Sequence, residues 1–409
     1  MKYILGGSNT IYNYLSTLEC SKKINEIFVE NCDILETFGS FIKLKPDNIK
    51  KSASKNIDRL RSYYMFQGCK LYVDSGGFQI CTGKVKPEIL DSVMHIYYEW
   101  LCENKSYDYA FTLDIPPAMT SYNGMDENML NRKSYEIAVG LPDEIRKKMI
   151  YIHQFGSPTS YKLFRDMLVD LDVVNKFNFF SLGGLVGGYR EFPVYPVVFG
   201  VIPIIRELKR NKKNIINLHI LGQSNSAIVV ILALLKKYIK QFHDIDTNIT
   251  YDSVTPINDT FEFRKFYYTD ENLKFQKIDL RKKKIGRIEI FSRVIDRKLK
   301  LLEEYDIDTS KFYEWFNEDN TKSRLLLFLI TLIDMSRLGQ MIDEMVENGI
   351  EIEDLLLHSN IKQKQNKLIL NAYYPSLRLL ESLDDDKSNY YYQNYVVNKK
   401  SEKTKLLTF

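Results

Sequence analysis

The chain has 409 residues, of which 44% are hydrophobic and 27% are charged, and this balance excludes global disorder and allows a sizeable core. A formal net charge of +4 excludes a histone-like basic protein but permits a polyanionic partner. The five cysteines, between Cys20 and Cys102, form no CxxC pair, which argues against a disulfide framework and against a structural zinc site of that type.

The cysteine pattern and the start of the chain both favour the cytoplasm. An odd number of scattered cysteines is typical of a reducing compartment. Met1 leads directly into a strand-like run, with no signal-peptide pattern. The longest apolar run, residues 325–333, is too short to span a bilayer. We therefore expect a soluble cytoplasmic protein with no membrane partner.

In chain order, eight short apolar runs end in polar residues or glycine and are separated by helix-like stretches. The predicted strands cover residues 2–5, 33–38, 71–73, 109–113, 149–152, 179–182, 217–221 and 248–251. The helical stretches between them include residues 87–103, 158–174 and 224–238. Alternating strands and helices predict a parallel sheet, and eight strands predict an α/β fold of the closed β/α (TIM) barrel type. An open doubly wound sheet is the alternative, because the first two strand patterns are the weakest.

Beyond about residue 285 the strand pattern ends and amphipathic helices are predicted. They cover residues 293–305, 323–348 and 361–383. The run 325–333 is apolar on nearly all sides, as in a buried helix. We therefore expect a barrel domain over residues 1–290 and a helical C-terminal extension over residues 291–409, with part of the tail, 384–409, disordered.

In a barrel of this type the functional residues lie where the strands end. Polar residues or glycines occupy six successive predicted strand ends: Asp74, Asp114, Gln154, Gly183 with Gly184, Gly222 and Asp252. Parallel strands bring such residues to one mouth of the barrel, so we expect a functional site there.

The sharpest motif is Asp-Ser-Gly-Gly-Phe-Gln at residues 74–79. An acid at a strand end followed by two glycines allows a backbone to approach a flat ligand closely, although a tight turn explains the same residues. As a string, the motif closely resembles one in the tRNA-guanine transglycosylase family. Members of that family have a β/α barrel and exchange guanine for a 7-deazaguanine-type base without breaking the strand.

Five further segments resemble motifs of that family in the same order. They are residues 112–118, 153–156, 181–185, 219–222 and 251–253. The resemblance implies that Asp114 reads the hydrogen-bonding edge of the base and that Gln154 also touches it. It implies further base contacts from Ser75, Gly183, Gly184, Leu185 and Gly222. No cofactor is expected.

The resemblance also assigns roles to two carboxylates. Asp252, as the strand-end nucleophile, attacks the anomeric carbon and forms a covalent sugar–enzyme intermediate. Asp74 acts as an acid when the purine leaves and as a base when the new one enters. Asp114 offers acceptors to the N–H donors of guanine, which selects guanine over adenine. A base that reacts in this way leaves the stack, so a flipped or single-stranded nucleotide is expected.

Two departures from the family pattern change the expected substrate. Residues 186–189, Val-Gly-Gly-Tyr, stand where the family usually has a Gly-Glu pair that orients the backbone for one type of incoming base, so the incoming base is open, with Glu191 as a candidate substitute. No cysteine follows Cys102, so the cysteine-rich zinc site of the tRNA-modifying members cannot form. The chain therefore resembles more closely the DNA-acting branch, the deoxypurine-in-DNA protein A group.

These features predict a DNA guanine transglycosylase. Its expected partners are DNA and a 7-deazaguanine base such as 7-cyano-7-deazaguanine, and partner proteins of a DNA-modification system are further candidates. A tRNA-directed enzyme without the zinc site is the first alternative. A non-catalytic nucleic-acid-binding barrel is the second.

Basic clusters and two histidines have open roles. The clusters cover residues 206–213, 281–287, 293–300 and 399–405. They are phosphate contacts if several share one face, and solvated helix faces otherwise. His153 and His219, on or next to predicted strands, are expected to pack in the core, with a site contact as the alternative for each.

Overall fold

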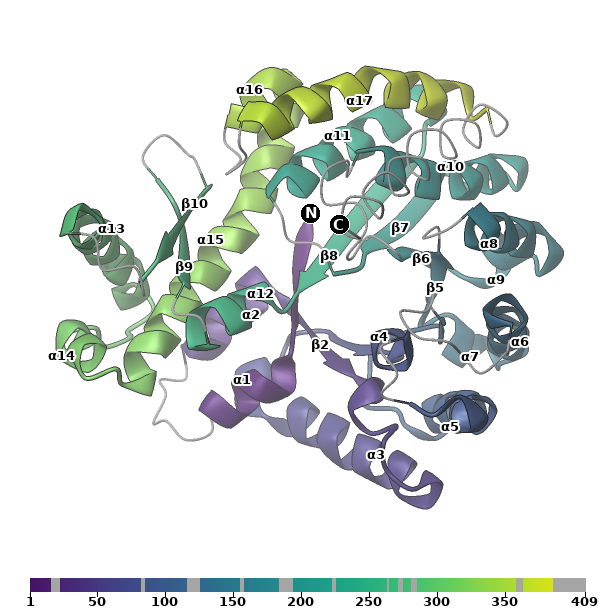
Figure 1. Cartoon of the computed structure of the whole chain (residues 1–409), viewed down its shortest axis with the longest axis horizontal. Helices are drawn as coiled ribbons and strands as arrows, with labels where there is room; N and C mark the ends of the chain where they lie inside the picture. The colour runs from purple at the N-terminus through teal and green to yellow at the C-terminus, as the bar shows by residue number, and fades with distance from the viewer. Residues whose placement is uncertain are drawn as a thin grey trace, which may run out of the picture.

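The computed structural model describes residues 1–15, 23–81, 85–115, 126–154, 158–183, 194–222, 226–262, 265–270, 275–280, 285–357 and 363–384. Its centre is a closed barrel of eight parallel strands, with helices around the outside (Figure 1). The strands are β1 Lys2–Gly6, β2 Asp33–Thr37, β3 Leu71–Asp74, β4 Tyr109–Phe111, β5 Met149–Gln154, β6 Phe179–Gly183, β7 Ile215–Ile220 and β8 Asp246–Ser253. Because β8 pairs in parallel with β1, the barrel closes, which confirms the predicted fold and excludes the open sheet.

Helices connect the successive strands, as parallel pairing requires. They are α1 Ser8–Leu15, α2 Ile24–Asn31, α3 Pro46–Ser62, α4 Gly77–Cys81, α5 Leu90–Glu103, α6 Glu127–Val139, α7 Asp143–Arg146, α8 Pro158–Asp170, α9 Val173–Lys176, α10 Val194–Arg210 and α11 Ser226–His243. Short 3₁₀ turns lie at Phe38–Ser40, Tyr64–Phe66 and Pro87–Ile89. Pro46 opens α3, where its missing N–H removes no helical hydrogen bond.

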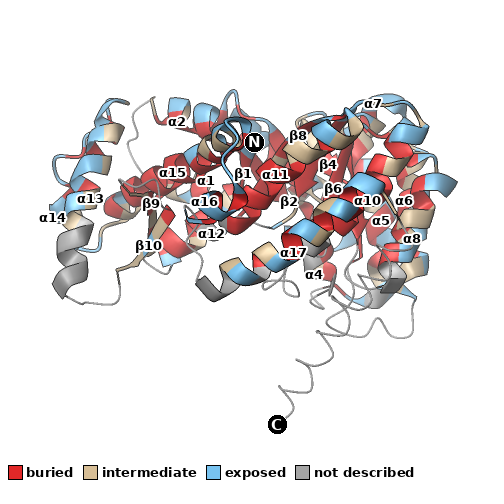
Figure 2. Cartoon of the chain, turned by 90° about the horizontal axis from the view of Figure 1, so that it is seen from above, coloured by how far each residue is buried: buried red, intermediate tan, exposed pale blue. Residues whose placement is uncertain are grey.

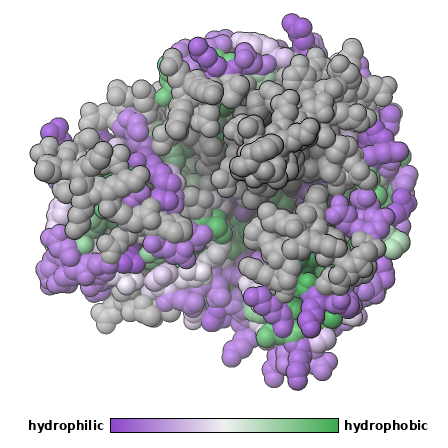
Figure 3. All heavy atoms as spheres, viewed as in Figure 1, coloured by the Kyte–Doolittle hydropathy of each residue, from purple (hydrophilic) through white to green (hydrophobic). Residues whose placement is uncertain are grey.

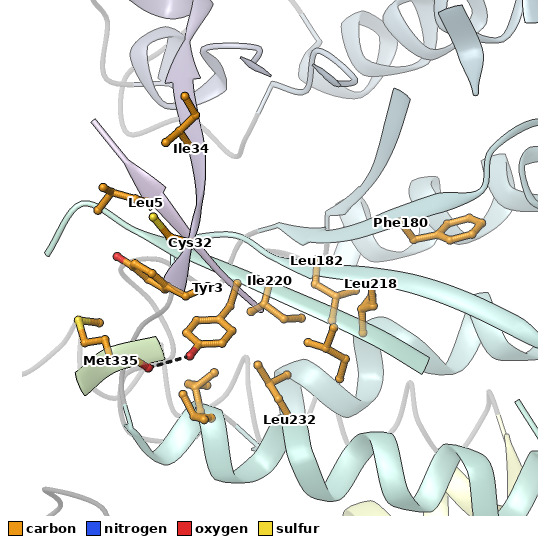
Figure 4. Close-up of a cluster of buried hydrophobic side chains, with 14 of the residues drawn as sticks. Tyr3, Leu5, Cys32, Ile34, Phe180, Leu182, Leu218, Ile220, Leu232 and Met335 are labelled. Atoms are coloured by element: carbon orange, nitrogen blue, oxygen red, sulfur yellow. Dashed lines mark hydrogen bonds between the residues drawn. The ribbon is translucent and has the colours of Figure 1, made fainter. Parts of the chain in front are cut away.

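Side chains alternate between the inside and the outside of the barrel, because the side-chain period of a strand is two residues. The inward cluster comprises Ile4, Leu35, Tyr72, Phe111, Ile150, Ile152 and Phe179. Outward side chains pack against the surrounding helices. Figure 4 shows Tyr3, Leu5, Ile34, Phe180, Leu182, Leu218 and Ile220 with Leu232 of α11 and Met335 of α15 (Thr321–Glu347). Because side chains fill its interior, the barrel is a packed core and not a pore.

The elements after β8 lie beside the barrel. α12 (Thr255–Ile257) and a π-helical turn (Asn258–Glu262) lead to an antiparallel hairpin of β9 (Lys265–Thr269) and β10 (Phe275–Asp279). The sequence pattern predicts no strand in this region, because two five-residue strands give only a short alternation. The remaining helices are α13 Ile285–Glu303, α14 Phe312–Asn317, α15, α16 Ile352–Leu357 and α17 Gln363–Ser382, and they include the three predicted C-terminal helices.

α15 occupies the position of the outer helix that would follow β8. It contacts α11, α2 and β1 of the barrel, and it also packs on β9 (Figure 1). Tyr251 of β8 donates a hydrogen bond to the Met335 carbonyl at 3.4 Å, and the amino group of Met1 pairs with Asp343 at 2.5 Å. The predicted division at residue 290 therefore separates the barrel strands from a helix that packs directly on them.

The burial of α15 explains its composition. By length and apolar content the helix could cross a membrane, but 83% of its most apolar stretch is buried inside the protein. This is the pattern of a core helix in a soluble barrel protein, and it confirms the predicted buried helix at residues 325–333 (Figure 2). On the face shown in Figure 3, the described residues that are visible are mostly hydrophilic, with small hydrophobic areas between them.

Phe328→Ala tests whether α15 and the barrel share one core. Phe328 is fully buried, with its ring 6.4 Å from Phe28 of α2 and 5.7 Å from Phe261. We expect the substitution to lower the free energy of unfolding by about 3–5 kcal/mol, measured by urea denaturation and circular dichroism. Leu357→Ala, at a side chain that is 57% exposed, is the control and should change stability by less than about 0.5 kcal/mol. Similar small effects for both variants would contradict the shared core.

Candidate active site

The carboxyl ends of the strands bring most of the predicted site residues to one mouth of the barrel. These residues are Asp74 at the end of β3 with Ser75 next to it, Asp114 after β4, Gln154 at the end of β5, Gly183 at the end of β6, Gly222 after β7 and Asp252 near the end of β8. The predicted base contacts Gly184 and Leu185, and the candidate Glu191, lie outside the described residues.

The carboxyl group of Asp74 is held by a threonine from the neighbouring strand. The Thr37 hydroxyl, at the end of β2, donates to Asp74 Oδ2 at 2.8 Å and accepts from the N–H of Gly39 at 3.1 Å. Burial raises the pKa of Asp74 above the usual aspartate value; the Thr37 hydrogen bond opposes this rise, and the charge of Asp252 adds to it. The carboxyl groups of Asp74 and Asp252 are therefore close enough to interact electrostatically.

The two glycines after Asp74 allow three strand ends to meet. Gly76 has a φ of +94°, and a Cβ atom there would lie 2.5 Å from the Cα of Gly39. A Cβ atom on Gly77 would lie 2.7 Å from the carbonyl oxygen of Asp114. The sequence predicts that these glycines let the backbone approach a flat ligand. In the structure, atoms of Gly39 and Asp114 lie where side chains at these two positions would be. They therefore join the ends of β2, β3 and β4.

Asp114 and Gln154 form a buried hydrogen-bonded pair. The Gln154 amide Nε2 donates to Asp114 Oδ2, and Gly183 makes room for it, since a Cβ there would lie 2.5 Å from that nitrogen. Burial raises the pKa of Asp114 to about 7; the Gln154 and Ser75 side chains oppose this rise, and the charge of Asp74 adds to it. Gln154 Oε1 is buried without a hydrogen-bond partner among the described residues, so it offers an acceptor to a ligand.

Among the described residues, hydrogen-bond contacts reach one of the two carboxylate oxygens of Asp252. The N–H of Gly222 donates to Asp252 Oδ1 at 2.6 Å, and Nε2 of His219 lies 3.0 Å from the same atom. Gly222 has a φ of +68°, a backbone conformation that favours glycine. Within the described part of the chain, Oδ2 accepts no hydrogen bond. Oδ1 of Asp252 is therefore fixed, whereas Oδ2 has no hydrogen-bond partner among the described residues.

The two strand histidines point in opposite directions. His219 is on the inward face of β7, and its ring lies 5.0 Å from that of Phe111. His153 points outward and packs against two aromatic rings of α8 at 6.0–6.1 Å. Since neighbouring residues of a strand face opposite sides, Gln154 faces the mouth and His153 does not. Packing is thus the observed role of His153, whereas His219 contacts the site through Asp252.

Sequence reasoning missed two threonines of this site. Thr37 ends a strand whose pattern is weak, so the predicted mouth does not include that strand end. Thr250 is two residues before Asp252, and its hydroxyl lies 2.9 Å from Nδ1 of His219. The alternation of side chains along a strand could have identified both threonines. It places Thr37 on the same inward face as Leu35, and Thr250 on the same inward face as Asp252.

The basic cluster at residues 206–213 lies far from this mouth. It covers the end of α10 and the turn before β7, which is the end of the barrel where strands begin. Arg210 there pairs with Glu207 at 2.6 Å. Lys209, Arg210 and Lys212 are exposed at that end of the barrel. Residues 293–300 lie on α13, and the clusters at 281–287 and 399–405 lie partly or wholly outside the described residues.

Comparison with known proteins adds no relative. No protein-family model matches the sequence, and a search of curated proteins gives no significant match. Within the described ranges, no group of three or more His, Cys, Asp or Glu side chains is arranged to hold a metal ion.

Gly76→Ala tests the packing of the strand ends. Both Gly76 and the control Gly349 have positive φ angles, of +94° and +80°, but a Cβ on Gly349 would meet no atom within 4 Å. We expect Gly349→Ala to cost about 1 kcal/mol of folding stability from backbone conformation alone. Gly76→Ala should cost about 3 kcal/mol or more in the same denaturation experiment, because the clash with Gly39 is added. Equal losses of stability in the two variants would contradict the close approach of Gly76 to Gly39.

Asp114→Asn tests the raised pKa of Asp114. Unfolded aspartate loses its proton near pH 4, whereas Asp114 in the folded protein keeps it up to about pH 7. The folded state therefore binds more protons between these values, and stability falls as the pH rises through them. We expect the stability of the wild type, relative to Asp114→Asn, to decrease from about pH 4.5 to about pH 7.5. If the stability of the wild type relative to Asp114→Asn stayed constant or rose over this pH range, the raised pKa of Asp114 would be contradicted.

Proposed function

We propose that this chain is a guanine transglycosylase that acts on DNA, in the DNA-modifying branch of the tRNA-guanine transglycosylase superfamily. The observation that carries the proposal is the pairing of Asp74 and Asp252 at the barrel mouth in different surroundings. Asp74 is enclosed and its pKa is raised, which suits a proton donor. Asp252 Oδ1 accepts a hydrogen bond from the N–H of Gly222 and lies 3.0 Å from Nε2 of His219, which suits an ionised nucleophile. A double displacement needs one carboxyl group that donates a proton and a second that attacks as a carboxylate.

The proposed reaction has two balanced steps. First, Asp252 attacks C1′ of the deoxyribose, so that a C1′–O bond forms and the C1′–N9 bond to guanine breaks. The electron pair of the broken bond goes to N9, which takes the proton of Asp74. In the second step the Asp74 carboxylate removes the N9 proton of the incoming base, and N9 attacks C1′. The C1′–O bond then breaks, and its electron pair returns to Asp252.

Asp114 and Gln154 support recognition of a guanine-type edge. Above about pH 7, where its carboxyl group is ionised, Asp114 can accept the ring N–H and the exocyclic N–H of guanine, which adenine does not present in this pattern. Gln154 contributes Oε1, which has no hydrogen-bond partner among the described residues, and Ser75 is fully buried next to Asp74. Guanine and a 7-deazaguanine base such as 7-cyano-7-deazaguanine share this edge, so one pocket can serve both. A base bound there has to be flipped or single-stranded.

DNA is the proposed polymer because of the composition and structure of the chain beyond the nucleophile. The chain has no cysteine after Cys102, and the described part of the region after β8 consists of the β9–β10 hairpin and helices, including α15, which packs on the barrel. tRNA is the second candidate, since the same chemistry applies to it. We place the reaction in the cytoplasm, where proteins of a DNA-modification system are candidate partners.

A non-catalytic nucleic-acid-binding barrel is the alternative from another class of function. The mouth argues against it, because a protein that only binds nucleic acid gains nothing from the cluster of carboxyl groups of Asp74, Asp114 and Asp252. A cluster of this kind is useful where protons are moved and a carbon atom is attacked.

Asp252→Ala should abolish the exchange of labelled guanine into nucleic acid. We expect a fall of at least about 10³-fold, because the covalent intermediate cannot form. Wild type and variant are incubated with labelled guanine and either single-stranded DNA or tRNA, and the label in the polymer is counted. Asp246→Ala, at the exposed beginning of the same strand, is the matched control and should keep wild-type activity.

Each outcome of this assay decides between the candidate functions. Equal incorporation by wild type and Asp252→Ala would contradict the mechanism. Incorporation into tRNA alone would keep the reaction and overturn DNA as the polymer. Binding of DNA with no incorporation by the wild type would favour the non-catalytic barrel.

A further inference from the structure

We infer that His219 is a positioning residue that fixes Asp252 and leaves Oδ2 as the attacking atom. The inference rests on the proposed function, since it concerns the nucleophile of that reaction. It goes beyond the sequence motifs, which assign a role to Asp252 but none to a partner of its carboxylate.

His219 bridges two side chains of the neighbouring strand. The register of β7 and β8 places it opposite Thr250. Its Nδ1 lies 2.9 Å from the Thr250 hydroxyl, and its Nε2 lies 3.0 Å from Asp252 Oδ1. Because Thr250 and Asp252 are two residues apart on the same face, one ring reaches both. Rotation of the ring would break both contacts at once.

The charge of Asp252 sets the direction of these hydrogen bonds. An ionised carboxylate only accepts, so Nε2 of His219 carries the proton and donates it to Oδ1. In a neutral ring, Nδ1 is then an acceptor, and the Thr250 hydroxyl donates to it. This tautomer satisfies both ring nitrogens and needs no further partner.

The surroundings of His219 keep the ring in place. The side chain is fully buried inside the barrel, with Phe111 at 5.0 Å. Ser181 is its register neighbour on β6, and the Ser181 hydroxyl makes no hydrogen bond to any described residue. Among the described residues, both hydrogen-bond partners of the ring therefore belong to β8, and the ring that packs against it, Phe111, is apolar.

The two donors at Oδ1 define what each oxygen of Asp252 does. Oδ1 is held by His219 and by the N–H of Gly222, so Oδ2 forms the bond to C1′. In the covalent intermediate Oδ1 becomes the ester carbonyl and keeps both donors. When the C1′–Oδ2 bond breaks, the same donors stabilise the carboxylate that is released. His219 transfers no proton in either step.

Two substitutions separate positioning from simple packing. His219→Gln places an amide N–H near the position of Nε2, whereas the shorter side chain of His219→Asn reaches only the position of Nδ1. We expect the single-turnover rate of covalent capture of single-stranded DNA to fall about 10²-fold in His219→Asn. His219→Gln should stay within about 10-fold of the wild type. The Kd for DNA should stay the same in both, as expected for a residue that acts through Asp252.

A second measurement observes the ring directly. The chain has five histidines, so ¹⁵N-histidine NMR spectra are simple enough to assign. We expect His219 to be a neutral ring with its proton on Nε2. The Nε2 signal should shift in Asp252→Ala and remain unchanged in Asp246→Ala, and Thr250→Val should weaken the tautomer preference.

The results distinguish a failed inference from a failed function. A wild-type rate in His219→Asn, a loss of rate in His219→Gln equal to that in His219→Asn, or a proton on Nδ1 would overturn the role of His219 while leaving the transglycosylase intact. An absence of covalent capture in the wild type would overturn the proposed function, and with it Oδ2 as the attacking atom. The expected ranking of rates together with the Nε2–H tautomer would support both.

Discussion

Closure of eight parallel strands into a barrel brings every carboxyl end to one mouth, and the alternation of side chains decides which residues enter it. On β5 this alternation turns Gln154 to the inside and His153 to the helices. On β8 it places Thr250 and Asp252 on the same face, where the neighbouring strand offers His219 to both. The chemistry of the site thus depends on strand register as much as on residue type.

Closure also crowds acidic groups that are distant in the sequence. Asp74, Asp114 and Asp252 come from three different strands, yet the charge of Asp74 acts on Asp114 and that of Asp252 acts on Asp74. Burial raises the pKa of Asp74 and of Asp114, whereas Asp252 Oδ1 accepts a hydrogen bond from the N–H of Gly222 and lies 3.0 Å from Nε2 of His219. Similar side chains therefore lie in different surroundings, which in the proposed reaction allows one mouth to hold both an acid and a nucleophile.

Much of the barrel could be predicted from sequence, because each strand is an apolar run that ends in a polar residue or glycine. The helix at residues 325–333 could also be predicted, but its place beside β1 could not, since apolar periodicity does not say which neighbour covers a helix. The bridge from His219 to Asp252 depends on the register of β7 and β8. The motif at residues 74–79 pointed to the site, but the reason for its glycines, close approach to Gly39 and Asp114, depends on the folded structure.

Covalent attachment of Asp252 to the sugar is the step on which the proposed chemistry depends. The most direct measurement is mass spectrometry of the wild-type protein after incubation with guanine-containing single-stranded DNA in the absence of an incoming base, followed by nuclease and protease digestion. We expect a deoxyribose adduct on the peptide that contains Asp252, together with release of free guanine. An unmodified Asp252 peptide, or an adduct on another residue, would contradict the proposed mechanism.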